Sequence, residues 1–238
     1  MTVPTPAALP VHIDPSHWIE CLDGMANEAT LQRWVEQPRF RQRLIDRLRR
    51  RHALADLDEL PQLDPADSTL CELDADALAL AIRAAGVIVH ANTVTREIQA
   101  SRVAALRQRL GSDLYALALT HRDIERDPLP HIDAAIGDDL DAFDTRIKQE
   151  GQRCLLAWAH EQPAPLKAWL RLGWLGRLPA DAYPTLAAVG HRNADHGDAD
   201  HGNGEAPDDA VGIARLAATH ALSRAAPQRP AERQGGES

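Results

Sequence analysis

The stretch from residue 73 to residue 124 decides the fold and reads LDADALALAIRAAGVIVHANTVTREIQASRVAALRQRLGSDLYALALTHRDI. Its apolar side chains recur at spacings of three, four and seven residues, which is typical of helices with one buried face. The members of the three sets are Leu78, Ile82, Ala85 and Val89, then Val94, Ile98 and Ala105, then Val103, Leu106 and Leu110. The pattern predicts two or three consecutive helices. They are too apolar to stand alone, so we expect the flanking segments to pack onto them.

Polar residues and one glycine predict where these helices begin and end. Asn92 is expected to cap a helix that restarts after Val89, because its side chain can accept hydrogen bonds from free backbone N–H groups. Gly111 is expected to end the next helix, and Ser112 with Asp113 to cap the one after it.

The remaining sequence also favours helices. Aromatic residues make up 4% of the chain, Ala, Leu and Arg are abundant, and runs of β-branched residues are nearly absent. Three N-terminal helices are expected to begin at Asp14-Pro15, Asn27 and Pro38. Their apolar faces would include Trp18, Ile19, Leu22, Leu31, Trp34, Val35, Phe40, Leu44, Ile45 and Leu48. A longer helix is expected from Leu140 to Trp158, with Gly151 on its apolar face, where a small residue allows close approach of another helix.

These patterns predict an all-α protein with one compact, bundle-like domain over residues 12–183. Residues 1–11 and 225–238 are expected to be disordered tails, and residues 184–209 a disordered linker rich in His, Asp and Gly. Such polar segments cannot bury enough apolar surface to offset the entropy lost on ordering. Residues 210–224 are expected to form a helix, with Val211, Ala214, Ala218 and Leu222 on one side, that docks on the main domain.

Charge is distributed unevenly along the chain. The formal net charge of −9 argues against a general affinity for nucleic acid. Residues 39–51 are nevertheless strongly basic, and residues 138–144 are acidic. As the densest opposed blocks, they supply candidate protein-binding residues, namely Arg43, Arg47, Arg50, Asp138, Asp139 and Asp141.

Two other interpretations of the basic helix remain open. Its arginines could simply neutralise acidic neighbours, or they could bind nucleic acid or an anionic lipid surface.

Three tryptophans occur close together after residue 157. Trp158 and Trp169 are expected to fill the core between helices. Trp174, which lies between Gly173 and Gly176, is the candidate exception, an aromatic anchor for a partner protein.

No sequence motif indicates catalysis or a cofactor. Phosphate-binding loops, dinucleotide-binding turns and nucleophile elbows are absent from the sequence. The histidines of the linker, His191, His196 and His201, match no metal-binding spacing, so no metal site is expected.

Cys21, Cys71 and Cys154 are widely spaced and predict free, half-buried thiols of a cytosolic protein. The sequence also contains neither a signal-peptide pattern nor a hydrophobic stretch long enough to span a bilayer.

The order of several segments resembles one protein family. These segments are LCELDADALALAIRAAGVIVHANTVTREI, a leucine-rich helix ending in LGS, and AWAHEQPAPLKAWLRLGWLGRLP. Between residues 70 and 179 the chain is similar to the SctK (YscK/HrpB4-like) family, with a fainter similarity near residues 12–34. Members of that family are cytosolic accessory proteins of bacterial type III secretion machines.

The resemblance implies a non-catalytic adaptor in the sorting platform below the inner-membrane ring. It implies two partners, the cytosolic domain of the ring protein (SctD-like) and the pod protein (SctQ-like). It implies no nucleic-acid partner and no membrane insertion, so the adaptor would reach the membrane only through the secretion apparatus. The alternative is a helical nucleic-acid-binding regulator that uses the basic helix. A helical enzyme is a third class, which a deep pocket with several titratable side chains would indicate.

Overall fold

The computed structural model describes residues 11–23, 25, 27–122, 136, 139–178 and 209–225. Over these residues the chain is all-α and contains no strand, which confirms the predicted fold class. The expectations for residues 1–11, 184–209 and 225–238 fall almost entirely outside the described residues. No helix in the described ranges is both long enough and apolar enough to cross a membrane.

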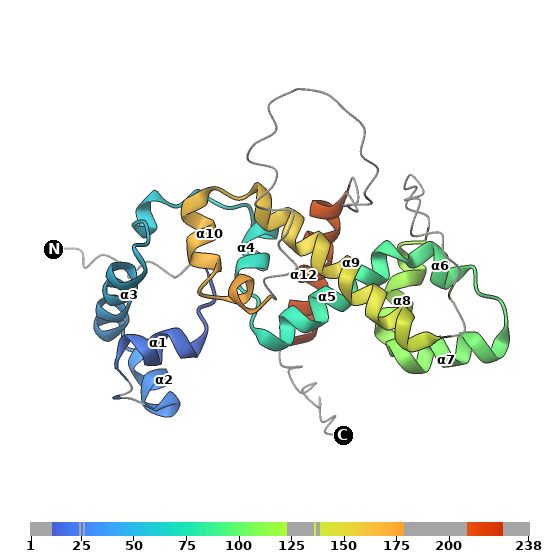
Figure 1. Ribbon diagram of the computed structural model, residues 1–238, viewed down its shortest axis with the longest axis horizontal. Helices are drawn as coiled ribbons and strands as arrows, with labels where there is room; N and C mark the ends of the chain where they lie inside the picture. The colour runs from blue at the N-terminus through green and yellow to red at the C-terminus, as the bar shows by residue number, and fades with distance from the viewer. Residues whose placement is uncertain are drawn as a thin grey trace, which may run out of the picture.

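Three helices form the centre of the molecule, α5 (Ala75–Val89), α9 (Leu140–Glu161) and α12 (Ala210–Ala225), and they cross one another there (Figure 1). The crossing of α5 and α9 is close. A Cβ atom added at Gly151 would lie 1.8 Å from the backbone oxygen of Ile82, and one at Gly86 would lie 1.8 Å from that of Ile147. The two backbones therefore touch at paired glycines. This confirms the expected role of Gly151, whereas the matching role of Gly86 was not predicted.

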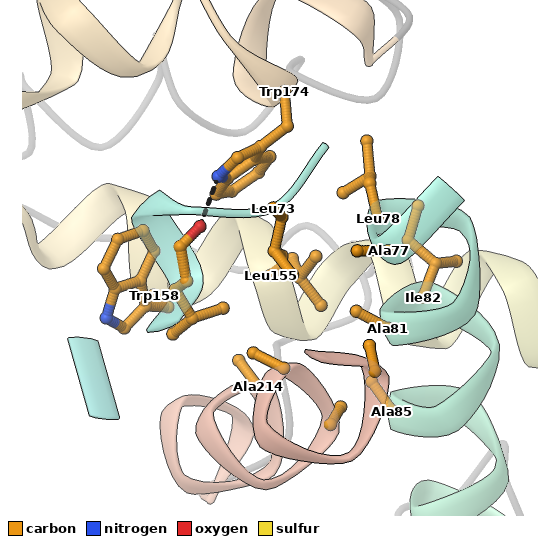
Figure 2. Packing of buried hydrophobic residues seen from close by; sticks show 14 of the residues in the cluster. Leu73, Ala77, Leu78, Ala81, Ile82, Ala85, Leu155, Trp158, Trp174 and Ala214 are labelled. Carbon is orange, nitrogen blue, oxygen red and sulfur yellow. Dashed lines mark hydrogen bonds between the residues drawn. The ribbon is translucent and has the colours of Figure 1, made fainter. Parts of the chain in front are cut away.

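Helix α12 packs against α4 (Pro65–Cys71), α5 and α9, as its sequence pattern predicts. Its buried side chains are mostly small and comprise Ala210, Ile213, Ala214, Ala217, Ala218 and Ala221. Figure 2 shows Ala214 of α12 beside Ala81 and Ala85 of α5. The buried face of α12 differs from the predicted one by part of a turn. Val211 and Leu222, which were expected on the buried side, lie only half-buried at its edges. Small side chains allow α12 to approach its neighbours closely.

One end of the molecule is formed by three short helices that follow α5, namely α6 (Ala91–Thr95), α7 (Ala100–Leu110) and α8 (Ser112–Thr120). Gly111, with φ 84°, ends α7 as predicted. The predicted caps are wrong, because Asn92 lies inside α6 and α8 begins without a side-chain cap. The expected burial of Ile98 is also wrong. This residue lies between α6 and α7 and is 89% exposed.

The other end is formed by α1 (Pro15–Cys21), α2 (Glu28–Glu36) and α3 (Pro38–His52), which pack on one another (Figure 1). Asp14 and Asn27 cap α1 and α2 as predicted, accepting hydrogen bonds from the backbone N–H groups of Ser16 and Thr30, both at 2.9 Å. The N-terminal helices are joined to the body by backbone bonds from His12 to Cys71 (2.8 Å) and from Asp14 to Leu172 (2.9 Å).

The remaining elements lie between the N-terminal helices and the centre. They are a 3-10 turn at Leu57–Glu59, helix α4, helix α10 (Ala164–Leu170) and a 3-10 turn at Trp174–Arg177. Buried apolar residues from both ends and from the centre belong to one hydrophobic core.

Candidate protein-binding surfaces

Helix α3 is amphipathic, and part of its basic face is neutralised within the fold. Leu44, Ile45 and Leu48 are buried on its inner side. Among its arginines, Arg47 and Arg51 lie 2.8 and 3.8 Å from carboxylate oxygens of Asp23, which follows α1. Arg49 forms an ion pair with Asp56. These three arginines therefore neutralise acidic neighbours, which was one of the alternative interpretations of the basic helix.

Three other arginines of α3 remain exposed. Arg39, Arg43 and Arg50 form no ion pair with any residue in the described part of the chain. Arg50 uses its Nε to donate to the backbone oxygen of Asp46, one turn earlier in the helix, at 3.2 Å. Spacings of four and seven residues place the three arginines on one face of the helix. These three unpaired arginines therefore place positive charge on one outward face of α3.

An aromatic pair borders this face. The rings of Trp34 in α2 and Phe40 in α3 stack with centroids 6.0 Å apart and an interplanar angle of 13°. Phe40 is 43% exposed and Trp34 is half-buried, although both were expected on buried helix faces. Trp34, Arg39, Phe40 and Arg43 are called the basic corner below. The sequence did not reveal the stacked pair, because Pro38 separates the two helices and only their packing brings the rings together.

The acidic block at the start of α9 is largely engaged in local structure. Asp139 caps the helix, its Oδ1 accepting from the backbone N–H groups of Asp141 (2.9 Å) and Ala142 (3.1 Å). Asp141 pairs with Arg109 of α7. Asp138 lies outside the described residues. The predicted docking residues Asp139 and Asp141 thus have structural partners of their own.

Asp144 extends this network into the interior. It is buried, and its carboxylate lies 2.7 Å from Nζ of Lys148 and 3.4 Å from the guanidinium of Arg83. Burial alone would raise the pKa of Asp144, but the Lys148 hydrogen bond and the charges of Lys148, Arg83 and Arg109 lower the pKa below its ordinary value. Asp144 therefore stays ionised and joins α9 to α5 and α7.

The structure corrects the expectation for Trp174. Its side chain is 1% exposed, and its indole N–H donates to the backbone oxygen of Leu70 at 2.7 Å (Figure 2). The ring lies 6.1 Å from that of Trp158, with which it shares the core. Trp174 cannot anchor a partner from this position. Trp158 and Trp169 are core residues, as predicted.

A buried carboxylate that sequence analysis did not single out connects three helices. Asp67 of α4 accepts hydrogen bonds from Nε1 of Trp158 in α9 (2.7 Å) and from Nε and Nη2 of Arg215 in α12 (2.7 and 3.0 Å). The Arg215 hydrogen bonds lower the pKa of Asp67; burial opposes them, and the Trp158 bond adds to them. Its partners lie 91 and 148 residues away in sequence, so no local pattern could reveal the cluster.

The remaining candidate residues from the sequence are three cysteines and three histidines. Cys21, Cys71 and Cys154 are free thiols as predicted, but they are fully rather than half-buried, and burial raises the pKa of Cys71 to about 12. No group of three or more His, Cys, Asp or Glu side chains suited to a metal ion occurs among the described residues. His191, His196 and His201 lie outside them.

Compared with protein-family models, with curated proteins and with solved structures, the chain matches none of them.

Proposed function

We propose that this protein is a non-catalytic adaptor of a bacterial type III secretion system, which works in the cytosol and links two other proteins. Its partners would be the cytosolic domain of an SctD-like ring protein and an SctQ-like pod protein. The ordered similarity of residues 70–179 to the SctK family supports this proposal. The structural observation that carries it is the outward face of α3, where Arg39, Arg43 and Arg50 are exposed without an acidic partner in the described residues.

The position of that face suits an adaptor. Helix α3 lies at one end of the long axis of the molecule, and α6 to α8 lie at the other end (Figure 1). Two partners that bind at or near opposite ends would not collide. The helices between them share one hydrophobic core, which would hold the two partners at a defined separation.

A nucleic-acid-binding regulator is less well supported by the same face. Specific and non-specific DNA binding draws its affinity from many phosphate contacts, on the order of six to ten for typical proteins. Three of the seven arginines from Arg39 to Arg51 are engaged by Asp23 or Asp56, and the chain carries a net charge of −9. A partner with a few well-placed carboxylates fits the remaining arginines better than a polyphosphate does.

The direct test uses three purified proteins from one organism, namely this chain, the SctD-like cytosolic domain and the SctQ-like protein. Size-exclusion chromatography with light scattering should give a complex of this chain with each partner and a complex of all three. Failure to bind either partner would contradict the proposal. Tight, salt-sensitive binding of duplex DNA in a parallel gel-shift assay would favour the regulator instead.

A further inference from the structure

We propose that the basic corner binds an acidic protein segment that carries an apolar side chain. The inference rests on the proposed function, because it states the chemistry of one partner of the adaptor. It assigns the carboxylates of that segment to Arg39 and Arg43 and its apolar side chain to the exposed surface of the Trp34–Phe40 pair.

The charge of the corner specifies the sign of the partner. Arg39 and Arg43 are four residues apart in α3 and so lie next to each other on its surface. Neither has an ion pair with another described residue, although Arg47 and Arg49 of the same helix each pair with an aspartate. Two adjacent, unpaired guanidinium groups repel each other and present donors in a geometry that suits carboxylates.

The aromatic pair gives the corner an apolar component. Four of the five tryptophans, Trp18, Trp158, Trp169 and Trp174, are buried, and Trp34 is the remaining one. Its ring is held by Phe40, which is itself 43% exposed. Aromatic residues and arginine are the side chains that contribute most to binding at the centres of protein interfaces. Aromatic rings bury large areas with little loss of side-chain entropy, and arginine forms bidentate hydrogen bonds with carboxylates.

The ligand of the basic corner is expected to be a protein segment rather than a polyanion or a membrane. The corner offers only two adjacent arginines, with Arg50 two turns further along the helix. Asp46, which lies between Arg43 and Arg50 on the same side, would repel a continuous row of phosphates. A short segment with carboxylates on either side of one apolar residue avoids this repulsion.

The test uses nuclear magnetic resonance of the full-length protein with a defined probe. The probe is a short peptide with a leucine and a phenylalanine flanked by glutamates, and the control peptide has lysines in place of the glutamates. The indole N–H signal of Trp34 is assigned with the Trp34→Phe variant. The acidic peptide should shift this signal in a saturable way, and the lysine peptide should not.

Matched variants separate the corner from general electrostatics. R39E/R43E should weaken binding of the acidic peptide by about tenfold or more, and Phe40→Ala should weaken it by a similar factor. R96E/R171E makes the same change in net charge at exposed arginines elsewhere and should leave binding unchanged. Circular dichroism of each variant shows whether the helices are retained. If R39E/R43E unfolds, the Arg39→Gln and Arg43→Gln single variants replace it.

Three results would overturn the inference. They are no Trp34 shift at millimolar peptide, an equal loss of binding in R96E/R171E, or a stronger Trp34 shift with single-stranded oligonucleotide or vesicles of phosphatidylserine. The peptide experiment needs neither secretion protein, so the two proposals fail separately. A Trp34 shift without binding of the SctD-like or SctQ-like protein would contradict the proposed function and retain the acidic-segment site.

Discussion

Asp67 shows how one buried carboxylate organises distant parts of this chain. A buried charge is costly unless it is paired and hydrogen-bonded, and Asp67 obtains three hydrogen bonds from Trp158 and Arg215. Because these residues belong to α9 and α12, the carboxylate favours one arrangement of the two helices around α4. We therefore expect Asp67 to contribute to the specificity of packing as well as to stability.

Replacing Arg215 should destabilise the protein more than replacing an arginine of a surface pair. Arg215→Ala leaves Asp67 buried with the Trp158 hydrogen bond alone, and we expect a loss of about 2 kcal/mol in the free energy of unfolding. Arg224→Ala removes a pair with Asp113 in which the two side chains are 46% and 56% exposed, so we expect a loss below about 1 kcal/mol. Urea denaturation measures both. Equal losses would mean that the Asp67 cluster adds no stability beyond a surface pair.

Asp67 should also make stability depend on pH. Its pKa in the folded protein lies below the ordinary value of 3.8, so the ionised form is the one that the fold favours. The resulting stabilisation is complete above the unfolded pKa and is lost as the pH falls through the folded pKa. Between pH 6 and pH 3 the unfolding free energy of the wild type should therefore fall more steeply than that of Asp67→Asn. Parallel curves for the two proteins would contradict this role.

At the scale of elements, the crossing of α5 and α9 depends on glycine at both contact positions. Gly151→Ala would place a Cβ atom 1.8 Å from the backbone oxygen of Ile82, so the helices would have to separate. We expect a loss of about 3 kcal/mol despite the higher helix propensity of alanine. Gly212→Ala is the control, because the three atoms nearest to its Cβ all belong to the side chain of Asp209, the closest at 2.3 Å, and this side chain can rotate. The control should change the midpoint of thermal unfolding little or raise it. A similar effect of both substitutions would argue against backbone contact at Gly151.

At the scale of the whole molecule, we expect the proposed adaptor to bind its two partners independently of each other. If the proposed adaptor binds one protein through α3 and the other elsewhere, the R39E/R43E variant should lose one partner and bind the other with unchanged affinity. Isothermal titration calorimetry with the SctD-like domain and the SctQ-like protein measures both affinities. Loss of both partners by a folded variant would mean that they share one surface, and retention of both would exclude the basic corner from the adaptor's contacts.

The sequence by itself determined the helices and most of the core. Spacings of three, four and seven residues, together with Asp14, Asn27, Pro38 and Gly111, placed the principal helices, because helix formation and termination depend on neighbours within a few residues. The same local rules selected Arg43 and Arg50, which are exposed, but they also selected Arg47, which pairs with Asp23. They failed at Ile98 and Trp174, where burial depends on which other element covers the residue.

Tertiary structure alone decided which charges are available and which helices meet. It paired Arg47 with Asp23, gave Asp139 and Asp141 structural partners, and left Arg39 and Arg43 beside a stacked aromatic pair. It also brought α12 against α5 and tied Arg215 to Asp67, 148 residues away. The physical reason is range. Helix propensity and capping act within a turn or two of the chain, whereas ion pairing and burial depend on distances in space that only the complete packing sets.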